Sequence, residues 1–179
     1  MELENLAAQH EAAIMKSRKD ELLRRIADEI ASGLACESDD AKDELFEFNK
    51  QALARAMLEA GFTSVTVRYS GCGDSGQTDS VDFEPAALDP SVVEVEMAQV
   101  RADYDQAQRE WKKELCFPSV TLPELASLLC DTAISLTGHD GWENNDGGEG
   151  TFTLQAEGAA AELEHSDFYV ERDTSMHAL

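Results

Sequence analysis

The sequence predicts an α+β fold in which an N-terminal helical hairpin and further helices pack on a roughly four-stranded antiparallel sheet. Apolar residues recur at steps of three and four in the first third of the chain, and two later segments alternate apolar and polar residues on both sides of glycines. With 179 residues, 42% of them hydrophobic, the chain is long enough for one core. We expect the helical hairpin in residues 1–61 and the sheet portion in residues 62–179, joined in one continuous domain.

Two helices are predicted before residue 62. Residues 2–32 carry apolar side chains at helical spacing and Gly33 is placed to end that helix, while a second helix covers about residues 40–60 and is followed by Gly61. The first helix has a long apolar stripe that a modest sheet cannot fully cover, so we expect a homodimer through these helices. Its segment 15–25 holds five of the 14 basic residues and forms a local basic band.

A β-hairpin is predicted for residues 62–84. Val65, Val67 and Tyr69 alternate with polar residues before the stretch SGCGDSGQ, and the alternation resumes after it. We expect a loop longer than the common two-residue turn, with room for a binding group. Three glycines of this loop can adopt positive φ angles: Gly71, Gly73 and Gly76.

Residues 91–115 fit two patterns. Val93, Val95 and Met97 alternate as in a strand, whereas Val93, Met97 and Val100 also fit the spacing of a helix that continues to Trp111. Because a run of this length is more typical of a helix than of a strand, the sequence favours a helix for most of the segment.

The last third of the chain predicts one more helix and a second hairpin. Thr121 and Glu124 have the spacing of a capping box, the following apolar residues recur at helical spacing, and Gly138 is placed to close the helix. Two alternating segments, TFTLQAEG and AAELEHSDFYVE, then follow each other, and little more than Gly158 separates their alternating parts. We expect them to pair in the same antiparallel sheet as the first hairpin.

The tetrapeptide GDSG around Ser75 also surrounds the nucleophile of trypsin-like proteases, but the rest of that mechanism is missing. The only upstream histidine, His10, lies in a predicted helix, and Gln77 stands where the protease motif has a second glycine. We therefore predict no catalytic residue. The four cysteines show no CxxC spacing, and no metal site or cofactor is predicted.

Charge is the strongest feature of the composition. The chain has 37 acidic and 14 basic residues, and residues 119–179 contain Arg172 as their only base. A compact chain of this length is about 40 Å across, and duplex DNA of that length carries about 24 phosphates, close to the net charge of −23. Direct binding to nucleic acid is unfavourable for such a surface, so we expect a basic protein partner.

The partner-binding residues are expected in this nearly base-free third of the chain. The proposed partner is a nucleic-acid-binding protein, and the protein would compete with its nucleic acid. No apolar run is long enough for a membrane span and the N-terminus is acidic, so a cytoplasmic protein without a membrane partner is expected. The candidate partner-binding residues are Asp140, Trp142, Glu143, Asp146, Glu149, Glu162, Glu164 and Asp167.

A second interpretation stays open, namely a small enzyme or ligand-binding domain with its site in the glycine-rich loops. If the two hairpins lie side by side, His139 and His165 would meet near Asp74 or Asp146, as a base and its orienting carboxylate. The candidate residues of this loop site are Asp74, Ser75, His139 and His165.

The stretches RYSGCGDSGQTDSV and GWENNDGGEGTFTL, with the later HSDFY, resemble a domain of unknown function found in bacteria and their mobile elements. The resemblance covers the middle and C-terminal parts of the chain. It implies that the two hairpins are family features, and it carries no activity. In charge and size the chain is also similar to acidic phage proteins that occupy DNA sites on host enzymes, including inhibitors of CRISPR effectors, although it shares no motif with them.

Overall fold

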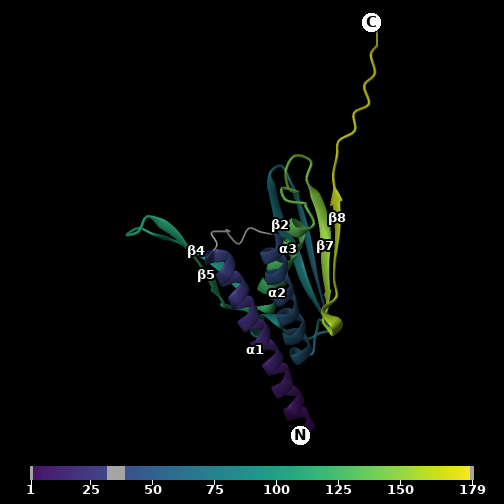
Figure 1. Cartoon of the computed structure of the whole chain (residues 1–179). Coiled ribbons are helices and arrows are strands. Elements are labelled where there is room, and N and C mark those ends of the chain that lie inside the picture. The colour runs from purple at the N-terminus through teal and green to yellow at the C-terminus, as the bar shows by residue number, and fades with distance from the viewer. Residues whose placement is uncertain (1, 32–38, 178–179) are drawn as a thin grey trace.

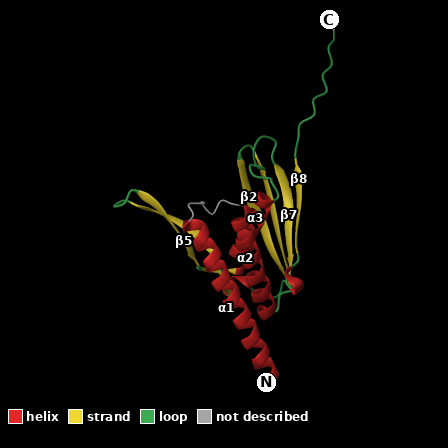
Figure 2. Cartoon of the chain, viewed as in Figure 1, coloured by secondary structure: helices red, strands yellow, loops and turns green. Residues whose placement is uncertain are grey.

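The computed structural model describes residues 2–31 and 39–177 and confirms the α+β class. A four-stranded sheet has the order β2-β1-β7-β8, and every neighbouring pair is antiparallel. Figures 1 and 2 show α2 and α3 on one face of this sheet, while no helix in the described part of the chain covers the other face. The elements are α1 (Glu2–Ala31), α2 (Asp39–Ala60), α3 (Leu122–Leu136), β1 (Ser64–Cys72), β2 (Ser75–Glu84), β7 (Gly148–Gln155) and β8 (Ala161–Asp167).

The main core lies between α2, α3 and the inner face of the sheet. Alternation along β1 directs Val65, Val67 and Tyr69 inward, and all three are buried. Leu53 and Met57 of α2 belong to the same cluster, so this core extends across residue 61. The helix α3 adds its own buried face, made of Leu122, Leu125, Ala126, Leu129, Cys130, Ala133 and Ile134.

Both helices that cover the sheet end where the sequence predicts. Gly61 has a φ of +90°, and the N–H groups of Gly61 and Phe62 donate to the carbonyls of Leu58 and Met57, which is the Schellman pattern. After α3 the same pattern recurs with Gly138 at φ +82°. At its start, α3 has the capping box of Thr121 and Glu124.

The first hairpin has a shorter turn than the sequence predicts. Cys72 pairs with Ser75, so only Gly73 and Asp74 form the turn, with φ angles of +62° and +69°, as in a type I′ turn. The expectation of a longer loop was wrong because the strand pairing continues through the glycines. Gly71 and Gly76 do not have positive φ, and their role is packing against Trp142.

The helix predicted for most of residues 91–115 is wrong, because the segment forms strands. The strand β4 (Gln99–Asp105) pairs with β5 (Glu110–Cys116) in a hairpin that projects from the body (Figure 1). Opposite charges and aromatic rings face each other across it, which stabilises strand pairing. Arg101 is directly opposite Glu114 and Tyr104 is directly opposite Trp111, while Asp105 forms a diagonal ion pair with Lys112.

Two short strands and a second, smaller core connect this hairpin to the helices. The strand β3 (Glu94–Glu96) pairs with β6 (Ser119–Thr121), and two 3₁₀ turns, η1 (Pro90–Val92) and η2 (Glu157–Ala159), complete the chain. Leu22 and Ile26 of α1 are buried against the base of the β4–β5 hairpin. The homodimer through the N-terminal helices stays a prediction, and Gly33 lies outside the described residues. Among the described helices, none combines the length and apolar character that a membrane span requires.

Candidate functional site

One cross-strand row of the sheet brings two polar rings together over a glycine. Tyr69 of β1 and His165 of β8 both align with Gly150 of the strand between them. Because Gly150 has no side chain, the Tyr69 hydroxyl reaches Nδ1 of His165 at 2.8 Å, and the two rings stack with centroids 5.9 Å apart. A Cβ atom on Gly150 would lie 2.2 Å from the Tyr69 oxygen. The glycine is therefore a requirement of this contact.

The next row supplies a carboxylate. Asp167 of β8 aligns with Gly148 of β7, which aligns with Gly71 of β1. The carboxylate of Asp167 lies 3.1 Å from Nε2 of His165. Since residues two apart on a strand share a face, the side chains of His165 and Asp167 both project toward the inner side of the sheet. His165 is held at both ring nitrogens, by Tyr69 and by Asp167.

His139 joins this pair from the end of α3. It is the second residue after that helix, and its N–H donates to the carbonyl of Ile134 in the Schellman pattern. The His139 and His165 rings lie with centroids 4.1 Å apart. Ligand atoms of His139, His165 and Asp167 all lie within 4.8 Å of one another. We call these three residues the histidine–aspartate cluster.

Trp142 covers the glycine end of the sheet beside the cluster. Its ring packs edge-on against Tyr69 with centroids 4.9 Å apart and contacts the main core. A Cβ atom on Gly76 would lie 2.6 Å from the indole, so the hairpin glycines make room for this ring. The turn residues Gly73 and Asp74 donate their N–H groups to the carbonyls of Asn145 and Glu143. The first hairpin and the loop after α3 are thus tied together.

Burial sets the electrostatics of the site. The side chain of His165 is 3% exposed, whereas that of Asp167 is 70% exposed, so the cluster is open to solvent on the Asp167 side. Burial, followed by the nearby Cys130 and Asp167, raises the pKa of Tyr69 to about 12. The Tyr69 hydroxyl is therefore protonated at neutral pH, and it can either donate to Nδ1 of His165 or accept from it.

The structure brings together only half of the predicted loop site. His139 and His165 meet, but their carboxylate is Asp167 rather than Asp74 or Asp146. The Asp146 carboxylate instead accepts the Val170 N–H at 3.0 Å. The exposed Ser75 hydroxyl donates to the Cys72 carbonyl at 3.5 Å.

The predicted partner-binding residues fall into two groups. Glu149, Glu162 and Glu164 alternate with inward residues of β7 and β8, so they lie on the uncovered outer face of the sheet. The second group lies at one end of the sheet: Asp167 is itself a member of the histidine–aspartate cluster, and the other four residues belong to the loop after α3, namely Asp140, Trp142, Glu143 and Asp146. In that second group Trp142 is half-buried against the core, whereas Asp140, Asp146 and Asp167 are exposed.

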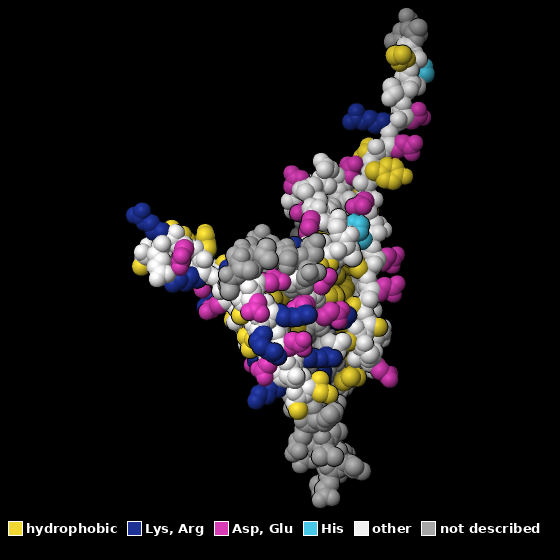
Figure 3. Space-filling view, in the orientation of Figure 1, with side chains coloured by type: hydrophobic (Ala, Val, Ile, Leu, Met, Phe, Trp, Pro, Cys, Tyr) yellow, Lys and Arg dark blue, Asp and Glu magenta, His cyan; other side chains and the backbone are white. Residues whose placement is uncertain are grey.

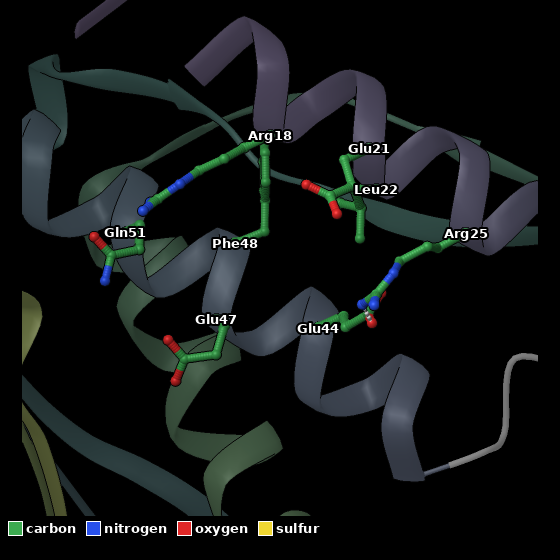
Figure 4. Close-up of a pocket in the computed structure, with 8 residues that line it drawn as sticks. All are labelled: Arg18, Glu21, Leu22, Arg25, Glu44, Glu47, Phe48 and Gln51. Carbon is green, nitrogen blue, oxygen red and sulfur yellow. Dashed lines mark ion pairs between the residues drawn. The ribbon is translucent and has the colours of Figure 1, made fainter. Parts of the chain in front are cut away.

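A separate hollow of about 320 Å³ lies between α1 and α2 and is shown in Figure 4. Leu22 and Phe48 contribute its apolar surface, and Arg25 forms an ion pair with Glu44 across it. Of the basic band on α1, Lys19 also pairs with Glu96, at 2.9 Å. Part of the positive charge of the basic band is therefore neutralised by acidic residues of the same chain.

Sequence reasoning missed the residues that assemble the cluster. The sequence indicates Tyr69 only as one of the alternating residues of the first hairpin, and it gives no role to Gly148 or Gly150. The available signal was the spacing Gly-x-Gly at the start of β7, because two glycines on one face of a central strand leave space for side chains of both neighbouring strands.

Comparison with known proteins assigns no function to the chain. No curated protein and no solved structure matches the chain.

A family model described as a family of unknown function (DUF6878) matches residues 45–179. This range contains most of α2, all four strands of the main sheet and every residue of the histidine–aspartate cluster. It omits α1. The chain belongs to this family of unknown function, DUF6878.

Proposed function

We propose that the protein is a non-catalytic acidic binding protein whose uncovered sheet face docks on a basic protein surface and excludes nucleic acid from it. The observation that carries the proposal is the distribution of charge on that face. Two acidic residues stand on each edge strand, and most side chains between them are neutral and carry hydroxyl groups, with Arg68 on β1 and Glu149 on β7 as the charged exceptions. The edge acids are Asp82 and Glu84 on β2, and Glu162 and Glu164 on β8.

One acid of each edge lies in the same cross-strand row. Asp82, Thr66, Thr153 and Glu162 form one row across the sheet. With strands about 4.8 Å apart, the two ends of this row are about 14 Å apart, similar to the roughly 12 Å width of the DNA major groove. Acids two residues apart on β8 are about 6.8 Å apart along the strand. Two edges of negative charge separated by a strip of mostly neutral side chains resemble the two phosphate backbones of a duplex on either side of a groove.

The β8 edge is the more negative of the two. The only base on the described outer face of the sheet is Arg68, and it pairs with Asp82 on the β2 side. Glu162 and Glu164 have no such neighbour on their own strand, and Glu149 extends their charge onto β7. Figure 3 shows acidic side chains along this edge. Steering by an uncompensated charge raises association rates and depends on salt.

The test is competition with DNA. Tagged protein is used to capture proteins from a native lysate, and the bound fraction is eluted with duplex DNA at constant ionic strength. We expect DNA to release basic nucleic-acid-binding proteins. For a purified partner, the triple variant Glu149→Gln/Glu162→Gln/Glu164→Gln should bind about tenfold or more weakly, with a shallower dependence of log affinity on log salt.

A charge-matched variant is the control. Glu110→Gln/Glu157→Gln/Glu171→Gln removes the same number of exposed acids away from the outer face of the main sheet, and it should bind as the wild type does. Equal loss in both variants would mean that net charge alone drives binding. Unchanged affinity and salt dependence in the first variant would overturn the proposal.

A further inference from the structure

We infer that the histidine–aspartate cluster, His139, His165 and Asp167, is a binding site for a divalent first-row transition-metal ion of the Zn²⁺ class. This inference does not rest on the proposed binding function. It rests on the ligand geometry, on the polar partner that orients His165, and on the solvent access of Asp167. The sequence predicted no metal site because two of the three ligands are more than twenty residues from the first.

The separations fit a shared ion. Two ligand atoms that are each about 2.1 Å from one metal ion are about 3.0–3.4 Å apart in octahedral or tetrahedral geometry. Nε2 of His165 and the carboxylate of Asp167 lie 3.1 Å apart. All three ligand atoms lie within 4.8 Å, and the half-buried His139 and the exposed Asp167 can turn to shorten the remaining distances.

Tyr69 orients His165 for this role. A metal-binding histidine usually has its second ring nitrogen hydrogen-bonded, which fixes the ring and the tautomer. The hydroxyl of Tyr69 is 2.8 Å from Nδ1 of His165. When Nδ1–H donates to this hydroxyl, Nε2 carries the lone pair and faces Asp167. In the other tautomer Nε2 carries the proton and donates it to the Asp167 carboxylate. With the ion bound, the ion occupies that position on Nε2, and the ring carries its one N–H proton on Nδ1.

The chemistry of the ligands selects the class of ion. Two imidazole nitrogens and one carboxylate suit Zn²⁺ and its first-row neighbours, whereas Ca²⁺ and Mg²⁺ prefer oxygen ligands throughout. Three protein ligands leave further positions for water or a small ligand. The Asp167 side chain is 70% exposed, so the open coordination positions of the ion face solvent. The His165 side chain is 3% exposed, so this ligand is fixed within the protein.

The sheet leaves space for the ion beside His165. A Cβ atom at Gly148 would lie 3.3 Å from Cε1 and 3.6 Å from Nε2 of that ring. Gly148 therefore keeps clear the side of the imidazole that carries the ligand atom. Gly150 does the same for the contact of His165 with Tyr69. The two glycines support the ligand and its orienting partner.

The test uses the full chain, treated with a chelator and then dialysed. Titration with ZnCl₂ by calorimetry should show one ion bound per chain, and titration with CoCl₂ should give visible absorption bands that report nitrogen and oxygen coordination. The variants His139→Ala and Asp167→Asn should each lower Zn²⁺ affinity about tenfold or more, as loss of even an outer partner does. Tyr69→Phe should lower it without changing the stoichiometry.

Two control variants distinguish this site from adventitious binding. Glu164→Gln changes an acid on the same strand but on the opposite face, and Cys72→Ser removes an exposed thiol. Both should keep wild-type Zn²⁺ affinity. Circular dichroism checks that each variant is folded. Wild-type protein that takes up neither Zn²⁺ nor Co²⁺ would overturn the inference, and so would wild-type affinity in both His139→Ala and Asp167→Asn.

Discussion

Single glycines decide which side chains can meet in the inner face of the sheet. At Gly150 the constraint is steric, since a Cβ atom would lie 2.2 Å from the Tyr69 oxygen and 2.4 Å from the Glu164 carbonyl. The Gly150→Ala variant must move backbone or break the contact between Tyr69 and His165. We expect the free energy of unfolding to fall by about 2 kcal/mol or more, as in overpacked cores, when it is measured by urea denaturation.

Gly158 provides the matched control for this substitution. It has a φ of +74°, and nothing lies within 4 Å of a Cβ atom built on it. Gly158→Ala therefore carries only the cost of a left-handed backbone, about 1 kcal/mol. A smaller loss for Gly150→Ala than for Gly158→Ala would show that the sheet relaxes around the added methyl group and that Gly150 is not required for the ring contact.

At the residue scale, the sequence predicted part of the site. It placed His139 after a helix and His165 on a strand of the second hairpin, and both placements follow from local signals such as Gly138 and period-two alternation. The partner Tyr69 could not be predicted, because its contact depends on which strand lies between it and His165. That order is a long-range property, and alternation within one strand does not encode it.

At the element scale, local signals located the helices and the two hairpins of the main sheet but not the β4–β5 hairpin. The capping box and the glycines after α2 and α3 act within a few residues, so they can be recognised in the sequence. In β4–β5 the deciding contacts are cross-strand. Tyr104 faces Trp111, and Arg101 faces Glu114. When the same residues are interpreted as a helix from their spacing, these cross-strand pairs are not considered.

The aromatic pair of this hairpin gives an element-scale prediction. Trp111 is 67% exposed and contacts Tyr104 with ring centroids 5.4 Å apart. Trp111→Ala should weaken the β4–β5 pairing by about 0.5–1 kcal/mol and leave the main core intact. Hydrogen exchange should show faster exchange at the amides of β4 and β5, with unchanged protection in α3 and β1.

Trp142 is the counterpart in the same measurement. It is half-buried, covers Gly71 and Gly76, and packs on Tyr69. Trp142→Ala should therefore lower protection throughout the main sheet, because large-to-small changes at packed aromatics cost several kcal/mol. If Trp111→Ala lowered protection in α3 as strongly as Trp142→Ala does, the projecting hairpin would be part of the same cooperative unit as the core.

At the scale of the whole molecule, charge and layering are arranged together. The helices cover one face of the sheet, and the other face is polar and acidic at its edges. Acidic edge strands also resist pairing with other chains, which protects a one-sided sheet from aggregation. The proposed partner binding would use these same charges, and their distribution was not predictable from composition, because composition does not say which face an acid occupies.

The net charge of −23 leads to a prediction about salt. Like charges repel within the folded chain, and ion pairs such as that of Lys19 with Glu96 are exposed or partly exposed and contribute little to stability. Screening extends over about 8 Å at about 0.15 M ionic strength, so added NaCl should weaken the repulsion more than it weakens these pairs. We expect the midpoint of thermal unfolding to rise between low salt and physiological salt.

The triple variant Glu149→Gln/Glu162→Gln/Glu164→Gln should have a higher midpoint of thermal unfolding at low salt, and that midpoint should change less as salt is added. A midpoint that falls as NaCl is added would mean that ion pairs outweigh self-repulsion, and the outer face would then be stabilised by its charges rather than strained by them.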